Sequence, residues 1–289
     1  MKISVVIPCY RVAGHIEQVL SMIPEDISDV YVVDDRCPEG TANLVASLSD
    51  ISRVKIIRHE VNRGVGGAVK SGYRAALADG ADIVVKLDGD GQMNPLDLPA
   101  LVAPIAKGMA DYTKGNRFYD LATIHQMPKI RLVGNAFLSF FSKLSSGYWG
   151  TFDPTNGFTA IHARALASIP LDKLSDRYFF ESDMLFRLNT IRAVVVDVPM
   201  ESRYGDEKSN LNIARIIPEF IWKHVRNFIK RILYNYYLRD MSIASFELPL
   251  GVFFCVFGLS YGFYSWYHSS MAGILTPPGT VMLSALPLL

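Results

Sequence analysis

The sequence has little cysteine, and its cysteines are not grouped. The three cysteines are Cys9, Cys37 and Cys255, and they lie far apart in the chain. An odd, scattered set has neither the paired spacing of a zinc site nor that of a redox motif, and it gives no basis for a disulfide framework. The sequence therefore favours a reducing compartment.

Other common signals are also missing. The six histidines show no H-E-x-x-H or other paired ligand spacing, and no serine stands in a G-x-S-x-G elbow, so zinc and hydrolase chemistry are not expected. A formal net charge of +1 provides no overall attraction to nucleic acid. The apolar run between Lys2 and Pro8 is too short for a secretory signal, so we expect the catalytic part to stay in the cytoplasm.

Short apolar runs alternate with helical patterns in the first part of the chain. The runs have strand length and are mostly β-branched, which suits strands buried on both faces; they are Ile3–Ile7, Val30–Val33, Val54–Ile57 and Ile83–Leu87. Helical segments between them are His15–Ile23, Ala42–Leu48 and Gly67–Ala78. This alternation predicts an α/β fold with a mostly parallel, doubly wound sheet whose strand ends form a ligand crevice.

The chain changes character after about residue 202. Residues 203–240 form a basic amphipathic segment, with eight basic and three acidic side chains between Arg203 and Arg239. Two interpretations stay open, a helix that covers the α/β core and a helix that lies on anionic lipid, and the second is favoured. We therefore divide the chain into a catalytic domain at 1–202, this juxtamembrane segment, and a membrane region at 241–289.

The membrane region contains one long uncharged run. Leu248–Tyr267 has 20 residues without a charge, which matches the roughly 20 residues that cross a bilayer, and aromatic residues stand near its end. A buried helix of a soluble protein is the alternative. A second apolar run follows Pro277 and Pro278, but the ten residues after Gly279 span only about half a bilayer, so a truncated or re-entrant second helix is expected.

Two carboxylates follow the fourth predicted strand. Asp88 and Asp90 are separated by one residue, and Gln92 comes two residues later. Acids at this spacing can point to one side and share a cation. Oxygen ligands favour Mg²⁺ or Mn²⁺, which would stabilise a departing diphosphate. An ordinary Asp-Gly turn is the alternative.

Three further segments carry candidate binding groups. Asp34 and Asp35 end the second predicted strand, where an acid can bind ribose hydroxyls or a base N–H. The turn Asn62–Gly67, which contains Gly64, is of the kind that lets the backbone approach a ligand, although an ordinary helix start has the same pattern. Arg117 suits bidentate contact with phosphate, although a surface arginine is the commoner case.

A resemblance to a known family rests on several runs that occur in the family's order: VVIPCYR, VVDD, NRGVGGA, KLDGDGQ, GNR, DPTNGF, the Glu181/Asp183 segment and RYGDEKS. Over residues 1–210 the chain resembles family 2 glycosyltransferases of the GT-A fold. Within that family it looks most like the dolichyl- and polyprenyl-phosphate sugar synthases, such as dolichol-phosphate mannose synthase. The resemblance implies sugar transfer by direct displacement with inversion, assisted by a metal on the leaving diphosphate.

The resemblance also implies roles for single residues. The metal ligands would be Asp88, Asp90 and Gln92. The residues around the donor would be Pro8, Tyr10, Asp34, Asp35, Gly64 and Asp88. Those near the phosphates or the acceptor would be Arg117, Asn156, Arg203, Lys208 and Ser209, although the family has Ser-Lys where this chain has Lys-Ser, and many relatives have serine in place of Asn156.

Glu181 and Asp183 are the two candidates for a general base, and Asp183 aligns best with the family's F-x-x-E/D-M-L pattern. A sugar hydroxyl needs such a base, whereas a lipid phosphate is already ionised. Glu181 has an alternative role as an acid at a helix N-terminus.

Three functions are therefore considered. The first is transfer from a UDP- or GDP-sugar to a polyprenyl phosphate at the cytoplasmic membrane face, where the basic segment would contact membrane lipids. The second is transfer to a hydroxyl of a lipid-linked glycan. The third is a catalytically silent, nucleotide-binding membrane scaffold, against which the intact acid pair argues. No nucleic-acid partner is expected, and the oligomeric state is left open.

Overall fold

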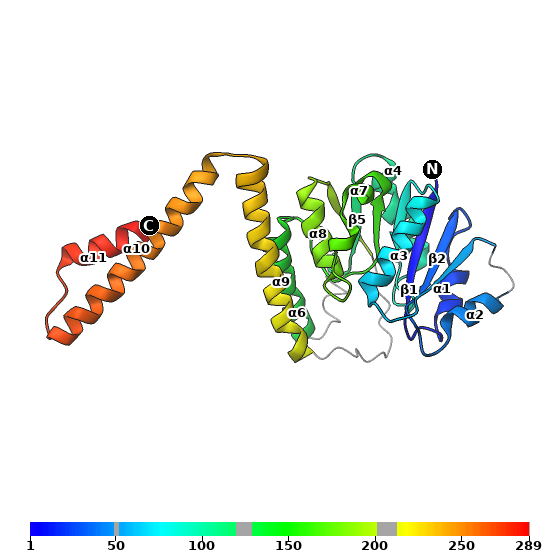
Figure 1. Ribbon diagram of the computed structural model, residues 1–289, viewed down its shortest axis with the longest axis horizontal. Helices are drawn as coiled ribbons and strands as arrows, with labels where there is room; N and C mark the ends of the chain where they lie inside the picture. Colours follow the sequence, from blue (N-terminus) through cyan, green and yellow to red (C-terminus); the bar gives the residue numbers. More distant parts are fainter. Residues whose placement is uncertain (49–51, 120–128, 201–212, 289) are drawn as a thin grey trace. The chain divides into compact units, whose positions relative to one another are not determined.

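The computed structural model describes residues 1–48, 52–119, 129–200 and 213–288. They form two units, Met1–Arg231 and Ile232–Leu289, and each unit is described by itself (Figure 1). The predicted boundaries at residues 202 and 240 stay predictions, because residues 201–212 lie outside the described part of the chain.

The first unit contains a mixed sheet. In the described residues it has seven strands in the order β3-β2-β1-β4-β6-β5-β7. Their bounds are β1 Ile3–Cys9, β2 Asp29–Asp34, β3 Val54–Arg58, β4 Ile83–Lys86, β5 Tyr112–Asn116, β6 Thr159–His162 and β7 Val195–Pro199. β6 runs antiparallel to both of its neighbours, and the other strand pairs are parallel. The predicted mostly parallel α/β sheet is confirmed.

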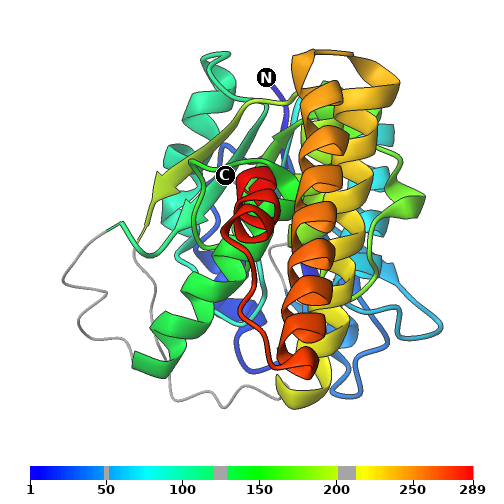
Figure 2. The ribbon, with the colours of Figure 1, turned by 90° about the vertical axis from the view of Figure 1, so that its left-hand side faces the viewer.

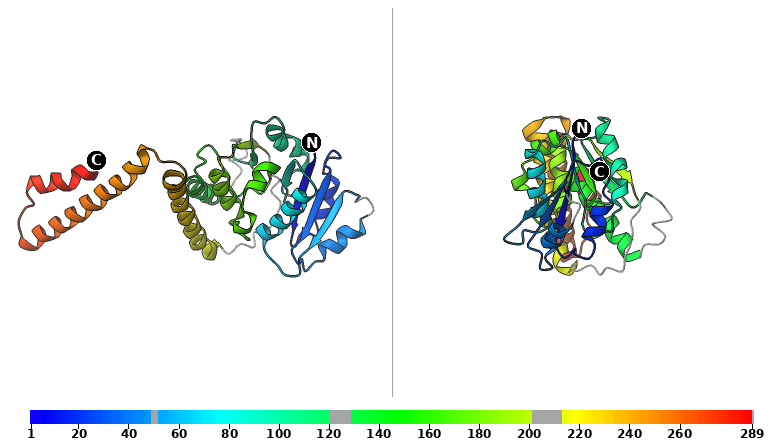
Figure 3. Two further views of the ribbon diagram at one scale, coloured as in Figure 1. Left: turned by 45° about the horizontal axis from the view of Figure 1, so that its top comes forward. Right: turned by 90° about the vertical axis from the view of Figure 1, so that its right-hand side faces the viewer.

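Helices cover both faces of this sheet (Figure 3). One face packs on α1 (Ile16–Ser21), α2 (Thr41–Ser47) and α4 (Leu98–Ala106), and the other on α3 (Val65–Ala78), α7 (Ala163–Ser168) and α8 (Phe180–Thr190). Successive strand residues point to opposite faces, so Val5 and Ile7 belong to the first core and Val6 to the second. Both faces of β1, β2 and β4 are buried, which is why these apolar runs could be recognised as strands; β3, at the edge of the sheet, is only partly buried.

Two longer helices, α6 (Lys129–Ser146) and α9 (Ile213–Leu233), pack against each other beside α8 (Figure 1). Polar contacts join them: Ser145 Oγ lies 2.8 Å from His224 Nδ1, and Arg231 Nη2 donates to the Leu144 carbonyl at 3.0 Å. Asn227 Nδ2 of α9 also donates to Asp183 Oδ1 of α8 at 3.0 Å. Burial lowers the pKa of His224 to about 4, so this imidazole is neutral at physiological pH and hydrogen-bonds as such.

The two helices reverse the usual arrangement of polar and apolar side chains. Their buried residues include Ser139, Ser142, Ser145, Ser146, His224 and Asn227. Their exposed residues include Val133, Phe137, Phe140, Ile217, Ile221, Trp222, Val225, Phe228 and Ile229. Figure 2 shows α6 (green) and α9 (yellow) from the side away from the sheet. A soluble helix normally turns its apolar stripe to the core, so these outward faces need another apolar environment.

The second unit is helical. It contains α10 (Ile243–Ala272) and α11 (Pro278–Ala285), and α11 packs on α10 where Gly262 leaves room for Ser284. Among the described residues, α10 is the one helix long and apolar enough to cross a membrane, and it contains the predicted span Leu248–Tyr267. Short helical turns complete the chain: η1 Pro95–Asp97, η2 Leu171–Lys173, the π-helical η3 Tyr234–Arg239 and η4 Leu286–Leu288.

Candidate active site

The carboxyl ends of β1, β2 and β4 border a cavity of about 740 Å³, where a parallel sheet is expected to bind its ligand. Six of the predicted donor or metal residues line it: Pro8, Tyr10, Asp35, Gly64, Asp88 and Asp90. Glu181, at the start of α8, also lines it. Apolar wall residues come from α6 and α9, namely Leu138, Ile217 and Phe220. The cavity therefore joins a charged region to an apolar one.

Lys86, the last residue of β4, contacts two of the cavity's carboxylates. Its ammonium lies 2.7 Å from Asp88 Oδ1 and 3.1 Å from Glu181 Oε1, and it donates to the Gly157 carbonyl at 3.2 Å. The side chain is 1% exposed. Burial lowers the pKa of Lys86, but the charges of Asp88 and Glu181 outweigh burial and raise the pKa above its ordinary value. This buried lysine therefore stays charged, as a buried ion with two opposite charges beside it should.

Gly157 makes room for this ion pair. A Cβ atom at this position would collide with Asp88 Oδ2 and with Lys86 Nζ. The residue comes from the DPTNGF loop, which leads into β6. The backbone of this loop thus packs directly on the side chains of Lys86 and Asp88.

Asp88 and Asp90 form an oxygen donor set on the same cavity. Asp90 Oδ1 accepts a hydrogen bond from the Gln92 backbone N–H at 3.0 Å, which shapes the turn. Within the described ranges, no three His, Cys, Asp or Glu side chains group together as a metal site. Mg²⁺ and Mn²⁺ are often held by one or two carboxylates, with water and substrate phosphates completing the shell. Two carboxylates facing one cavity fit such an ion when it binds together with a diphosphate.

Asp35 uses both carboxylate oxygens inside the protein. Oδ1 lies 2.7 Å from His59 Nδ1 and accepts from the Arg63 N–H at 2.8 Å, while Oδ2 accepts from the Gly64 N–H at 2.7 Å. His59 Nε2 in turn lies 2.8 Å from Ser71 Oγ on α3. Asp35 therefore anchors the turn before α3, in addition to lining the cavity.

Asp34 lies outside the cavity's lining. Its Oδ1 accepts from the Cys37 N–H at 2.6 Å, and its Oδ2 accepts from the Ala42 N–H at 3.0 Å in the first turn of α2. A carboxylate at this place satisfies backbone donors that the helix leaves unpaired. These contacts describe a structural acid.

The glycines at the start of α3 allow close packing of the protein on itself. Gly64 has φ +87°, and a Cβ there would lie 2.6 Å from the Asp176 carbonyl. Gly67 N–H donates to that same carbonyl at 3.0 Å. The turn thus seats the segment just before α8, which carries the cavity residues Arg177 and Tyr178.

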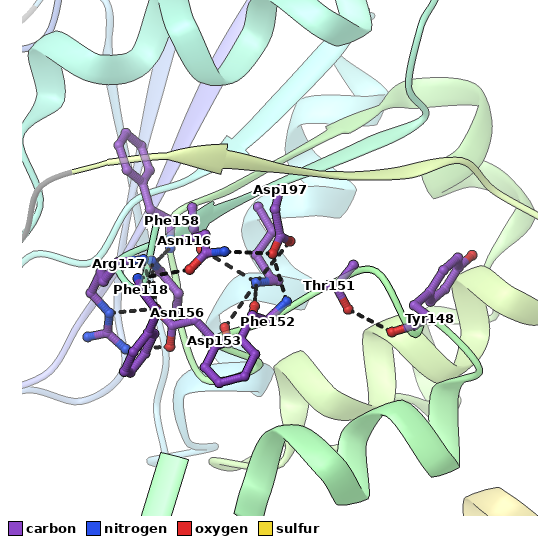
Figure 4. A network of polar contacts seen from close by, with 12 residues as sticks. Asn116, Arg117, Phe118, Tyr148, Thr151, Phe152, Asp153, Asn156, Phe158 and Asp197 are labelled. Atoms are coloured by element: carbon purple, nitrogen blue, oxygen red, sulfur yellow. Dashed lines mark hydrogen bonds and ion pairs between the residues drawn. The ribbon is translucent and has the colours of Figure 1, made fainter. Parts of the chain in front are cut away.

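Arg117 belongs to a buried network that fixes the DPTNGF loop (Figure 4). Its Nε and Nη2 donate to the two carboxylate oxygens of Asp153 at 2.6 and 2.7 Å. Asp153 is fully buried and adopts φ +53°, a costly conformation that its surroundings must hold in place. Asn156 Nδ2 also donates to Asp153, at 3.4 Å. Neither Arg117 nor Asn156 is among the cavity-lining residues.

Lys114 completes this network from β5. Its ammonium contacts the carbonyl of Phe152, donates to the carbonyl of Asp153 at 3.0 Å and lies 3.3 Å from Asp197 Oδ1. Asp197 also accepts from the Phe152 N–H at 2.7 Å. Two cations and two carboxylates thus hold one loop, and its Thr155 lines the cavity.

Asp183 and Glu181, the two candidate bases, lie in different surroundings. Asp183 is 1% exposed and does not line the cavity. Its Oδ2 accepts from the Ser175 N–H at 2.9 Å, and its Oδ1 accepts from Asn227 on α9 at 3.0 Å. Glu181 faces the cavity, and burial raises its pKa although Lys86 counteracts this. The predicted residues Arg203, Lys208 and Ser209 lie outside the described residues.

Sequence reasoning missed Lys86, although a signal was present. The run Ile83–Leu87 is apolar except for this one lysine, and a charge inside a buried strand requires an opposite charge beside it. The nearby acid pair supplied one partner. The other, Glu181, is too far along the chain for a local pattern to find.

Comparison with known proteins agrees with this geometry. Residues 4–169 match the family model described as "Glycosyl transferase family 2". The chain is 30% identical over 218 residues to UDP-N-acetylglucosamine–dolichyl-phosphate N-acetylglucosaminyltransferase of Methanococcus voltae, covering 71% of this chain and 86% of the relative. It is 29% identical over 221 residues to undecaprenyl-phosphate mannosyltransferase of Micrococcus luteus, covering 74% and 90%.

A solved structure shares the fold. Glucosyl-3-phosphoglycerate synthase of Mycobacterium tuberculosis, in complex with Mn²⁺, UDP and phosphoglyceric acid, superposes with a TM-score of 0.58 at 18% identity, over 80% of this chain and 78% of that one. The chain belongs to glycosyl transferase family 2 and has the GT-A fold. It is a glycosyltransferase with relatives that act on polyprenyl phosphates.

Proposed function

We propose that this enzyme transfers a sugar from a nucleoside-diphosphate sugar, UDP- or GDP-linked, to a polyprenyl phosphate at the cytoplasmic face of a membrane, with Mg²⁺ or Mn²⁺ as cofactor. The observation that carries the proposal is the composition of the cavity. Its charged part holds Lys86, Asp88, Asp90 and Glu181, and its apolar wall comes from α6 and α9. A substrate with a phosphate head and a long apolar chain has the same two-part chemistry.

The outward faces of α6 and α9 support a membrane location. Phe137, Phe140, Trp222 and Ile229 are each at least half exposed, and Arg226 and Lys230 of α9 are exposed as well. Apolar side chains flanked by cations suit the interface of an anionic bilayer. Helix α10 independently has the length and composition of a membrane span. Each feature, taken by itself, supports an enzyme that works beside a lipid surface.

The comparisons support the substrates. One relative is named for dolichyl phosphate and another for undecaprenyl phosphate, and the structural neighbour was solved with Mn²⁺ and UDP. A divalent ion would supply Lewis-acid stabilisation of the leaving diphosphate. Asp88 and Asp90, with Gln92, are the residues that would hold it.

The chain's own residues orient the two substrates. Pro8 and Tyr10, at the end of β1, line the part of the cavity that would take the nucleotide, and Asp35 holds the adjoining turn. The phosphate of the acceptor has a second pKa of about 6. It is therefore already an anion at neutral pH, and its oxygen attacks the sugar without a general base. Glu181 then serves to orient, and Asp183 holds α8 against α9.

Transfer to a glycan hydroxyl is the second candidate, because Glu181 faces the cavity where such a hydroxyl would need a base. Burial raises the pKa of Glu181 and favours this role, although its ion pair with Lys86 opposes it; the polyprenyl phosphate is preferred because the apolar wall of the cavity suits its long chain. The two candidates differ in their product.

The test is to incubate membranes containing the full-length enzyme with radiolabelled UDP- and GDP-sugars and a polyprenyl phosphate, and then to extract the lipids. A labelled lipid that releases its sugar in mild acid is expected, and it should require Mg²⁺ or Mn²⁺. Membranes with the Asp90→Ala variant are the control. Label that mild acid releases only as part of a longer oligosaccharide would contradict the phosphate acceptor.

A further inference from the structure

Lys86 touches one carboxylate from each of two distant segments. Asp88 belongs to the turn after β4, and Glu181 begins α8. With the carbonyl of Gly157, the three contacts account for all three protons that an ammonium can donate. No proton of this side chain is left for a substrate.

The base of this cluster is rigid. Lys86 pairs with Val6 of β1 on one side and with Thr159 of β6 on the other. If the Lys86 ammonium moved away, the buried Glu181 carboxylate would lose its counter-charge, which is costly. The position of Asp88 therefore follows from the sheet, through one fixed ammonium.

We propose that Lys86 is a positioning residue for the metal site: by holding Asp88 Oδ1, it fixes the orientation of the carboxylate that would hold the divalent ion. The proposal rests on the proposed function in that it requires a divalent ion bound with the nucleotide. Partners that orient a metal ligand in this way typically contribute 10–100-fold to affinity or activity.

A double variant separates orientation from charge. Replacing Lys86 alone would leave an unpaired buried acid, which changes stability and charge together. The double variant Lys86→Met/Glu181→Gln removes the Lys86 ammonium and the Glu181 carboxylate together. The native cluster has one cation against two carboxylates, and the double variant keeps the Asp88 carboxylate alone, so both carry one net negative charge. Coulomb attraction for the ion is then matched, and a change in affinity reports orientation.

Two single variants serve as controls. Glu181→Gln keeps the bond from Lys86 to Asp88. Lys70→Met removes another buried lysine, whose ammonium donates to the Leu174 carbonyl at 3.0 Å and pairs with Asp176, away from Asp88. Lys70→Met should not change the affinity for Mn²⁺, whereas Glu181→Gln measures the effect of losing this one carboxylate while Lys86 still holds Asp88. Thermal unfolding of all three variants identifies any loss of the folded protein.

The measurement is the affinity for Mn²⁺, followed by the electron paramagnetic resonance of the free ion, with the full-length protein in detergent and with UDP or GDP present. The double variant should bind Mn²⁺ about 10–100-fold more weakly than the native protein, whose cluster has the same net charge. Equal or tighter binding in the folded double variant would overturn the proposal, because Lys86 would then only compete with the metal. If the native protein binds no Mn²⁺ with either nucleotide, the metal in the proposed function fails instead.

Discussion

Two acid pairs follow two parallel strands of the same sheet, one on each side of β1, yet they do different work. The pair after β2, Asp34 and Asp35, spends its oxygens on backbone N–H groups and on His59. The pair after β4, Asp88 and Asp90, faces the cavity, and one of its oxygens is held by a lysine. Acids in equivalent places therefore have different partners: four backbone N–H groups donate to the first pair, and that of Gln92 donates to the second.

The difference has an energetic consequence. A carboxylate that satisfies several buried N–H groups cannot be removed without leaving those donors unpaired, at about 1–3 kcal/mol each. Asp90 accepts one such bond, from the Gln92 N–H at the edge of the cavity, so its removal should cost less stability. Mutations should thus distinguish the two pairs. Changes in the pair after β4 should mainly lower activity, and changes in the pair after β2 should mainly lower stability.

The largest effect is expected for Asp90→Ala. A site with few oxygen ligands cannot lose a charged one, so sugar transfer should fall by more than the roughly 100-fold that removal of a supporting residue can cost. The urea midpoint of unfolding should stay close to the native value. Calorimetry with UDP and GDP checks the metal-dependent affinity, and unchanged affinity in the presence of Mn²⁺ would remove Asp90 from the metal site.

Asp35→Ala should act on stability. The variant leaves the N–H groups of Arg63 and Gly64 and the imidazole of His59 without their acceptor, so the free energy of unfolding should drop by about 3 kcal/mol. Urea unfolding measures it. A native midpoint combined with a large loss of nucleotide affinity would show that Asp35 acts by direct contact with the donor, and the comparison between the pairs would break.

Asp183→Asn tests a carboxylate that lies outside the cavity. The change disturbs the bond from the Ser175 N–H and that from Asn227, so a loss of about 1–2 kcal/mol in stability is expected. Transfer to a polyprenyl phosphate should remain measurable and stay well above that of Asp90→Ala. Complete loss of transfer with intact donor binding would instead favour a hydroxyl acceptor with Asp183 as its base.

The smallest effect on transfer is expected for Asp34→Ala. The variant leaves the N–H groups of Cys37 and Ala42 without their acceptor, so the free energy of unfolding should drop by about 2 kcal/mol, and the cavity keeps all of its lining residues. Thermal unfolding should detect the shift, while transfer rates at a permissive temperature should match the native enzyme. A specific fall in donor affinity would show that Asp34 reaches the nucleotide.

The prediction of the strands succeeded for a physical reason. Strands covered on both faces must be apolar along their whole length, so the runs at residues 3, 30 and 83 could be read locally. β6 was not read in this way, because it runs antiparallel and is short, with Thr159 and His162 at its ends. Asp88 and Asp90 could also be recognised locally, since their spacing itself implies a shared ligand.

The amphipathic pattern of α9 was recognised, and an apolar face turned to lipid was the favoured interpretation, but the pattern alone could not decide between this and a helix that covers the core. Periodicity shows that a helix has an apolar stripe, and it does not show whether that stripe faces the protein. In the structure, His224 and Asn227 face inward because Ser145 and Asp183 offer them partners. The apolar residues then point outward.

The sequence by itself determined the α/β class, the cavity edge and the acid pair, because each depends on residues close together in the chain. Only the tertiary structure decided that Asp34 and Asp35 bind backbone donors, that Arg117 pairs with Asp153, and that Lys86 joins Asp88 to Glu181. A buried charge must find its partners wherever the fold brings them, and contacts between distant segments leave no periodic trace in the sequence.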